Sequence, residues 1–182
     1  MTDSALLEFF QNIGILKLIP RAGWVRCGIE NPESVADHTF RTAVIAMFFG
    51  DILELDVEKV LRMSLLHDLA EVVTGDITPY DDERPEDKRR KEGIALYGLL
   101  QQVPNRNKYM DLWQEYDQQL SAEAKLVRNV DKLEMAIQAA EYKKQFPECD
   151  LSEFFSDAKK YFDIVEVKEM FGKLMMNYDT LE

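Results

Sequence analysis

Apolar residues recur at intervals of three and four positions through most of the chain, which predicts a protein built of helices. A first amphipathic helix is expected over residues 4–17, and it ends before Ile19-Pro20. The sequence holds only 8 Gly and 6 Pro, and no stretch alternates apolar and polar residues between turn signals, as a strand would. We therefore expect an all-α fold.

Turn and cap signals divide the rest of the chain into further helices. Ser34 with Asp37 resembles a capping box, which begins a second helix that runs to about Leu55. A third helix is predicted from about Val57 to Val73, before Gly75. Later helices are predicted at about 86–102, 106–118, 121–145, 151–161 and 164–178. The segment 20–32 is expected to be irregular, and Asp76–Pro85 is expected to be a mobile connection.

The predicted third helix carries one polar stripe on an otherwise apolar surface. At about 100° per residue, Ser64, His67, Asp68 and Glu71 fall within an arc of roughly 100°. A buried carboxylate costs several kcal/mol unless it is paired, so Asp68 and Glu71 need a cation in the stripe. A divalent metal ion would supply that charge, and an imidazole beside a carboxylate suits Mn, Co, Zn or Fe better than Ca.

The chain contains only two histidines, and each is next to an aspartate in the sequence. His38 shares a face of the second helix with Thr42, Ile45 and Phe49, so it can meet the stripe if the two helices pack together. Two interpretations stay open here. His38 either binds a metal ion or donates a hydrogen bond to a backbone carbonyl in the first helical turn.

A fourth metal ligand has to come from elsewhere in the chain, and the chain has 34 acidic residues. Asp131 is a candidate because it lies among apolar residues at helical spacing, where an unpaired charge is unfavourable. The alternative is an ordinary ion pair between Asp131 and Arg128, three residues earlier.

Composition sets the class of protein. A chain of 182 residues, 46% of them hydrophobic, can bury a core large enough to fold without disulfides, and we expect one domain over residues 1–182. Cys27 and Cys149 are expected to be free thiols in the cytoplasm. No secretory signal is recognised, and the longest apolar run, 43–49, is far short of the roughly 20 residues that span a bilayer, so no membrane partner is expected.

A net charge of -12 excludes a polymeric nucleic acid as the expected partner, because the chain would repel a polyanion. A small anionic substrate fits if a metal ion and a few local cations neutralise it. The basic run 88–91 follows an acidic segment, and we interpret it as a solvated helix face.

The residues singled out above resemble a known pattern. His38, His67-Asp68 and Asp131 are similar to the H...HD...D signature of the HD-domain superfamily of metal-dependent phosphohydrolases. Residues 20–25, 32–38, 66–71, 75–77 and 121–125 resemble the 5'-deoxynucleotidase branch of that superfamily. The likeness covers roughly residues 6 to 142. It implies the orthogonal helical bundle of an HD domain, hydrolysis of deoxyribonucleoside 5'-monophosphates to orthophosphate, and a homodimer.

The same resemblance implies roles for individual residues. His38, His67, Asp68 and Asp131 match the ligands of one divalent metal ion, whether Mn, Co, Zn, Fe or Mg. Glu71 matches the catalytic carboxylate, and Asp76 matches a second active-site acid.

Two more residues match substrate-binding positions. Arg21 matches an arginine that contacts phosphate or sugar, and Trp24 matches a tryptophan beside the sugar. Some bacterial relatives place the tryptophan directly after the arginine, whereas Ala22-Gly23 intervene here. A role for Trp24 as a loop anchor that packs on the core is therefore the alternative.

Two other functions fit the same motifs. HD enzymes with these four ligands also cleave nucleoside triphosphates or guanosine tetraphosphate. A catalytically silent HD fold that binds a nucleotide is the second alternative, and Glu71 with Asp76 argues against it.

Overall fold

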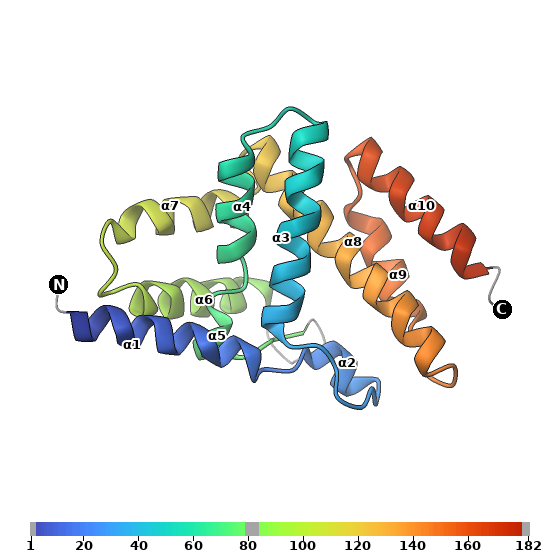
Figure 1. The fold of residues 1–182 in the computed structure, drawn as a ribbon, viewed down its shortest axis with the longest axis horizontal. Helices are drawn as coiled ribbons and strands as arrows, with labels where there is room; N and C mark the ends of the chain where they lie inside the picture. The colour runs from blue at the N-terminus through green and yellow to red at the C-terminus, as the bar shows by residue number, and fades with distance from the viewer. Residues whose placement is uncertain (1–2, 79–83, 180–182) are drawn as a thin grey trace.

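The computed structural model describes residues 3–78 and 84–179, and every named element in these ranges is a helix (Figure 1). The predicted all-α fold is confirmed. Its elements are α1 (Asp3–Ile13), η1 (Gly14–Lys17), α2 (Ala22–Arg26), α3 (Val35–Ile52), α4 (Val57–Leu66), α5 (Glu71–Thr74), α6 (Pro85–Leu99), α7 (Arg106–Asp117), α8 (Ala122–Gln145), α9 (Ser152–Ala158), η2 (Lys159–Tyr161) and α10 (Val165–Asp179).

Three helices form the centre of the bundle. α3 packs against both α4 and α8, and α4 also contacts α8. In Figure 1, α1 runs across the lower end of α3, while α6 and α7 lie on one side of this centre and α9 and α10 on the other. Residues that are distant in the sequence therefore meet where α3, α4 and α8 come together.

The start of α3 has the local structure that the sequence predicts. The Ser34 hydroxyl accepts a hydrogen bond from the Asp37 backbone N–H, and the Asp37 carboxylate accepts one from the Ser34 N–H, at 3.2 and 2.9 Å. This reciprocal capping box satisfies two N–H groups that the helix would leave unpaired. It also fixes His38 in the first turn of α3, directed at the bundle centre.

The predicted third helix is not continuous, and this part of the prediction was wrong. α4 ends at Leu66, a turn covers residues 67–70, and α5 begins at Glu71. The His67 Nδ1 atom lies 2.6 Å from the Ser64 carbonyl oxygen, the acceptor that the Asp68 N–H would use in a continuous α-helix. The turn instead uses tighter bonds from Leu69 to Leu66 and from Glu71 to Asp68.

Two further segments differ from the expectation in detail. The segment 20–32, expected to be irregular, contains the short helix α2. The expected mobile connection over Asp76–Pro85 lies partly outside the described residues, since residues 79–83 are not described. The last predicted helices agree with the structure to within a few residues, except that 151–161 is divided into α9 and η2.

The buried apolar residues form two clusters. The larger surrounds α8 and includes Met63, while the smaller joins η1, α6 and the turn after α4 and includes Leu66 and Leu69. His67 lies between these residues in the sequence. The turn after α4 therefore lies where the two clusters meet.

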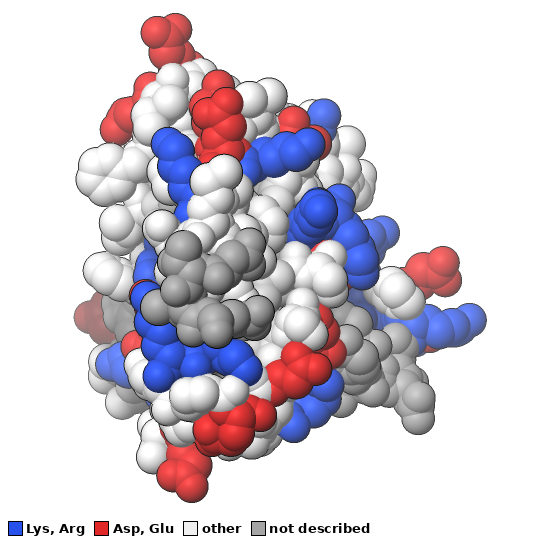
Figure 2. Space-filling view, turned by 90° about the vertical axis from the view of Figure 1, so that its right-hand side faces the viewer, with Lys and Arg blue, Asp and Glu red and all other residues white. Residues whose placement is uncertain are grey.

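Charged side chains of both signs share the surface. On the face that Figure 2 shows, the basic side chains form separate groups, with acidic and uncharged side chains between them. Among the described residues, no helix is both long enough and apolar enough to cross a membrane.

Candidate metal centre and cleft

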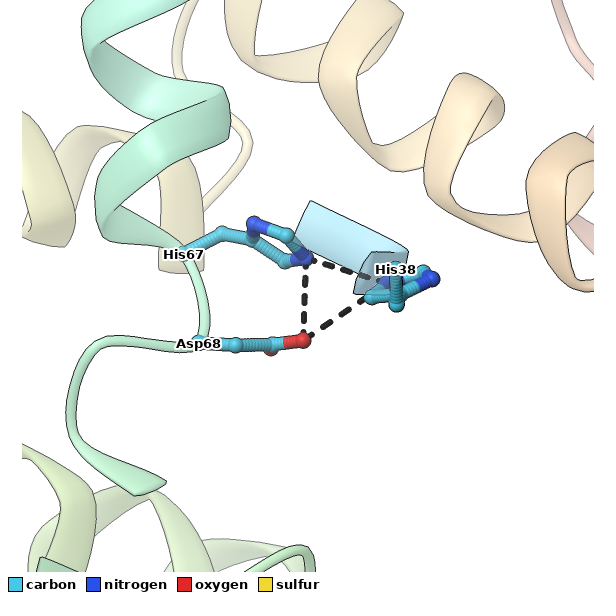
Figure 3. Close-up of side chains that lie close together, drawn as sticks. All are labelled: His38, His67 and Asp68. Carbon is cyan, nitrogen blue, oxygen red and sulfur yellow. Dashed lines mark hydrogen bonds and ion pairs between the residues drawn. The ribbon is translucent and has the colours of Figure 1, made fainter. Parts of the chain in front are cut away.

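Three of the predicted site residues meet at the end of α4. The Nε2 atoms of His38 and His67 lie 3.4 Å apart. The Asp68 Oδ2 atom lies 3.1 Å from His67 Nε2 and 3.6 Å from His38 Nε2. Figure 3 shows the three side chains converging, with His38 from α3 and the other two from the turn after α4.

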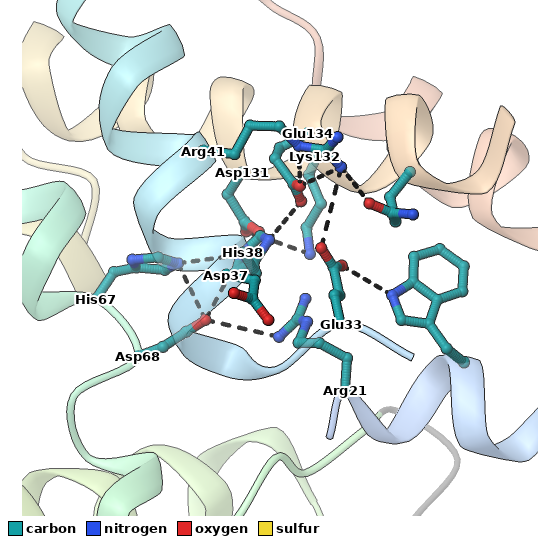
Figure 4. A network of polar contacts seen from close by, with 12 residues as sticks. Arg21, Glu33, Asp37, His38, Arg41, His67, Asp68, Asp131, Lys132 and Glu134 are labelled. Atoms are coloured by element: carbon teal, nitrogen blue, oxygen red, sulfur yellow. Dashed lines mark hydrogen bonds and ion pairs between the residues drawn. The ribbon is translucent and has the colours of Figure 1, made fainter. Parts of the chain in front are cut away.

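Asp131 reaches this group from α8 through His38 (Figure 4), whereas the ligand atoms of His38, His67 and Asp68 all lie within 4.8 Å of one another. Its Oδ1 atom lies 3.3 Å from His38 Nε2, and its Oδ2 atom lies 3.4 Å from the Lys132 Nζ atom. No ion pair between Asp131 and Arg128 is found in the described structure, so the alternative interpretation of Asp131 is not supported.

The outer nitrogen of each ring faces a hydrogen-bond acceptor. His67 Nδ1 faces the Ser64 carbonyl oxygen, and His38 Nδ1 is in close contact with the Glu134 carboxylate. In the neutral form of each ring, Nδ1 therefore carries the proton and Nε2 presents a lone pair to the other ring. Asp68 lies beside both Nε2 atoms, and Asp131 lies beside that of His38. The alternative interpretation of His38, a hydrogen bond to a backbone carbonyl, is not supported, because the ring contacts the Glu134 carboxylate instead.

Facing acceptors of this kind are unfavourable unless a proton or a metal ion lies among them, and the dimensions of the group formed by His38, His67 and Asp68 fit a divalent ion. Atoms that each lie about 2.1 Å from one ion are about 3.0 Å apart at right angles and about 3.4 Å apart at tetrahedral angles. The three contacts among the ligand atoms of His38, His67 and Asp68 range from 3.1 to 3.6 Å, and Asp131 adds a contact of 3.3 Å to His38. Two imidazole nitrogens and two carboxylate oxygens are also the donor set that a borderline metal ion prefers.

The electrostatics of the ligands follow from this crowding. Although burial and Arg21 disfavour a charged ring, Glu134 and Asp131 raise the pKa of His38 to about 9. Burial opposes ionisation of Asp131, but Lys132 and His38 together hold the pKa of that carboxyl well below its usual range. The pocket therefore favours positive charge at its centre and ionised carboxylates around it.

Glu71 lies next to this group with an unsatisfied oxygen. Its side chain is buried at the start of α5, and its Oε2 atom has no hydrogen-bond partner in the described structure. Burial and the negative charges of Asp68 and Asp76 raise the pKa of Glu71 well above its usual range. This carboxyl therefore keeps its proton to a higher pH than an ordinary glutamate does, which suits a general acid or base.

Arg21 and Asp76 meet beside the four ligands. The Arg21 guanidinium lies 3.3 Å from Asp76 Oδ1 and 3.6 Å from Asp68 Oδ2. The second Asp76 oxygen accepts a hydrogen bond of 2.7 Å from the Ala22 N–H at the start of α2. Asp76 therefore connects α2 to the turn region and fixes the position of Arg21.

Trp24 has the surroundings of a loop anchor. Its side chain is 2% exposed and packs against Tyr142 and Phe154, with ring centroids 5.3 and 4.1 Å away. Its indole N–H donates to Glu33 at 2.9 Å. Trp24 borders the cleft, but its only polar group is already bound.

The sequence interpretation missed Glu134, which lies three residues after Asp131 on α8 and is fully buried. Its Oε2 atom contacts His38 Nδ1, and its Oε1 atom accepts a hydrogen bond of 2.7 Å from Arg41 Nε. An acidic residue one helical turn from Asp131, within an apolar stretch, was the available signal. It could not be separated from the other carboxylates without knowing that α3 lies opposite.

The ligand group opens into a cleft with a volume of about 650 Å³. His67, Asp68, Glu71, Asp76 and Asp131 all line it, together with residues of α2, α6, α7, α8, α9 and η2. This volume is within the range of clefts that hold small ligands. Lys88 and Arg89 also line it, so half of the basic run expected to be solvated faces the cleft instead.

The fold is an all-helical bundle with a candidate metal site, and sequence comparison gives the family of the chain. The sequence profile of the HD domain matches residues 13–168. The human protein named 5'-deoxynucleotidase HDDC2 is 38% identical over 179 residues, which are 97% of this chain and 87% of the human protein. The Xenopus laevis protein of the same name is 44% identical over 142 residues, 77% of this chain and 70% of that protein. The chain belongs to the HD domain family.

Solved structures show the same fold. A conserved hypothetical protein from Pyrococcus furiosus has a TM-score of 0.79 and 33% identity over 93% of this chain and 99% of its own. A protein from Pyrococcus horikoshii has a TM-score of 0.80 and 31% identity over 92% of this chain and 97% of its own. The predicted HD-domain bundle is confirmed.

The contact between Glu134 and His38 generates a prediction about metal affinity. Glu134→Gln keeps the shape of the side chain but replaces the carboxylate that orients the ring, so we expect the dissociation constant for Mn²⁺ to rise roughly 10- to 100-fold. Isothermal titration of metal-free protein measures it. Glu141→Gln, which also removes a carboxylate that contacts Arg41 but on the exposed side of α8, is the control and should stay within about twofold. Equal affinities of Glu134→Gln and the unmodified protein would contradict the prediction.

Proposed function

We propose that this chain is a metal-dependent 5'-deoxynucleotidase, which hydrolyses deoxyribonucleoside 5'-monophosphates to deoxyribonucleosides and orthophosphate. The observation that carries the proposal is the convergence of two imidazoles and two carboxylates at the base of a cleft lined with basic residues. Relatives from animals to yeasts that bear the name 5'-deoxynucleotidase are 34 to 44% identical to the chain. Their likeness covers most of the chain and supports the same reaction.

One divalent metal ion would be held by His38, His67, Asp68 and Asp131. When bound, such an ion lowers the pKa of a water molecule and offsets the negative charge of a phosphate. Mn, Co, Zn and Fe are the candidates that suit this mixture of nitrogen and oxygen ligands, and Mg, which prefers oxygen ligands, is the remaining candidate.

The chain's own groups would complete the site. Glu71 Oε2, which has no hydrogen-bond partner among the described residues, takes a proton from the attacking water and can return it to the leaving sugar oxygen. Arg21 stabilises charge that develops on the phosphate, and Asp76 holds Arg21 in position through the contact described above.

We also propose that the residues 1–182 form one domain that works as a homodimer. The outer face of α3 carries an apolar stripe of Phe40, Val44, Phe48 and Ile52 at four-residue spacing, and three of these side chains are 59 to 71% exposed. An exposed stripe of this kind is typical of an interaction surface, and a twofold axis would pack it against its own copy. The free thiols of Cys27 and Cys149 are consistent with the proposed cytoplasmic location.

The substrate class is tested by phosphate release from every ribo- and deoxyribonucleoside monophosphate with each candidate metal ion. We expect orthophosphate to be released faster from dAMP, dGMP and dCMP than from the matching ribonucleotides. Release of tripolyphosphate or pyrophosphate from triphosphates or guanosine tetraphosphate would replace the proposal with one of those activities. Nucleotide binding without hydrolysis would identify a catalytically silent module.

Single variants distinguish the residues that bind the metal ion from the residue that transfers a proton. His67→Ala and Asp68→Ala should lose both bound metal and turnover, because each removes a ligand. Glu71→Ala should keep the metal and lose about 10²- to 10⁴-fold in kcat, because it removes only the proton acceptor. Metal analysis of purified protein and initial rates of phosphate release measure both. Glu58→Ala, an exposed acid on α4, serves as the control, and full turnover in all three site variants would refute the assignment.

The proposed dimer depends on the apolar face of α3. Phe48→Glu places a charge in that face, so the particle mass should fall from that of two chains to that of one, because two like charges would meet across the axis. Size-exclusion chromatography with light scattering measures the mass. Met176→Glu, an equally exposed apolar position on α10, should leave the dimer intact. A monomeric unmodified protein would contradict the proposal.

A further inference from the structure

The cleft beside the candidate metal centre is lined by seven basic side chains, and six of them already have a carboxylate partner. An ion pair with a carboxylate lowers the attraction of a cation for any further anion. The pairs are Arg21 with Asp76, Arg26 with Glu153, Lys88 with Glu92, Arg89 with Asp117, Lys132 with Asp131, and Lys160 with Asp157.

Arg128 is the exception in the described part of the cleft. No carboxylate lies within 4.0 Å of its guanidinium, and its buried Nε atom has no hydrogen-bond partner there. The guanidinium carbon lies 4.9 Å from the centre of the Tyr116 ring, which is its one described partner. A guanidinium keeps its charge under all relevant conditions, so this half-buried group can bind an anion in a position where no described carboxylate lies within 4.0 Å.

The position of Arg128 places that anion next to the candidate metal centre. Arg128 lies three residues before Asp131 on α8, so both side chains project from the same face of the helix. The Tyr116 ring, which supports the guanidinium, also contacts the His67 ring edge-on, with centroids 5.8 Å apart. One aromatic ring therefore connects the unpaired cation to a predicted metal ligand.

Arg21 reaches the same cleft but has a different electrostatic state. Its guanidinium lies between Asp76 and Asp68, so two carboxylates compensate its charge before any ligand enters. Arg128 keeps its full charge. The planar guanidinium held over the Tyr116 ring also presents two N–H groups in the geometry that matches two oxygens of a phosphate.

We propose that Arg128 forms a phosphate-binding subsite of the cleft, which holds the phosphate of a nucleotide beside the candidate metal centre. The inference rests on the proposed function for the identity of the nucleotide, but the subsite itself follows from the unpaired guanidinium. The predicted phosphate contact of Arg21 would then be the weaker of the two, and Arg21 would act mainly through its pairs with Asp68 and Asp76.

The test measures binding as well as turnover, on protein loaded with Mn²⁺. We expect Arg128→Gln to lower the affinity for inorganic phosphate by roughly 10- to 100-fold and to raise the KM for dAMP by a similar factor. This is the usual effect of losing a charged hydrogen bond. Deoxyadenosine, which has no phosphate, should bind equally well to Arg128→Gln and to the unmodified protein. Isothermal titration gives the two affinities, initial rates give the KM, and metal analysis of the purified protein gives the metal content. Lys160→Gln, which removes a paired and exposed cation from the same cleft, should change phosphate affinity by less than about threefold.

Each other outcome decides against the subsite. Unchanged phosphate affinity in Arg128→Gln overturns it, and an equal loss for deoxyadenosine and phosphate shows that Arg128 contacts the sugar or base instead. If Arg128→Gln loses metal or helix content, Arg128→Lys decides. This variant keeps the charge without the planar group. Its affinity for inorganic phosphate should still fall by a few fold at normal metal content.

Failure of the subsite and failure of the proposed function give different results. A chain that hydrolyses no deoxynucleotide, yet binds inorganic phosphate through Arg128, retains the subsite and loses the proposed function. A chain that hydrolyses dAMP with the same KM in Arg128→Gln retains the function and loses the subsite.

Discussion

The contact between the Nε2 atoms of His38 and His67 is the constraint on which the rest of the site depends. Both rings are buried, their Nε2 atoms face each other across 3.4 Å, and Asp68 and Asp131 lie beside them. Such a group is stable only if a cation neutralises it and if the rings cannot turn away. Glu134 and the Ser64 carbonyl meet the second condition, since each fixes one ring through its outer nitrogen.

The break between α4 and α5 follows from the same requirement. A continuous helix would donate the Asp68 N–H to the Ser64 carbonyl, but the His67 side chain uses that acceptor. The resulting turn lets Asp68 face His38, while Glu71 begins a new helix beside the same cleft. The backbone thus bends between α4 and α5, and His67, Asp68 and Glu71 lie around this bend. In a straight helix the three side chains would follow one another along the helix axis.

Charge is distributed so that an acidic protein can still receive an anion. The net charge is -12, yet most cleft cations are matched by neighbouring carboxylates, and only Arg128 lacks such a partner among the described residues. Long-range repulsion is screened over about 10 Å in salt, whereas a cation within hydrogen-bonding distance acts directly on a bound phosphate. The local arrangement therefore determines what the cleft accepts.

The sequence by itself determined the helices, the capping box at Ser34 and the HD motif, because helical periodicity, caps and adjacent ligands are local properties of the chain. The resemblance of its motifs to the HD family also predicted His38, His67, Asp68 and Asp131 as one group of ligands. Only the tertiary structure decided that α4 stops at Leu66, that Glu134 supports His38 and that Arg128 lacks a carboxylate partner. These facts depend on which side chains from distant helices share one small volume, and spacing along the chain does not contain that information.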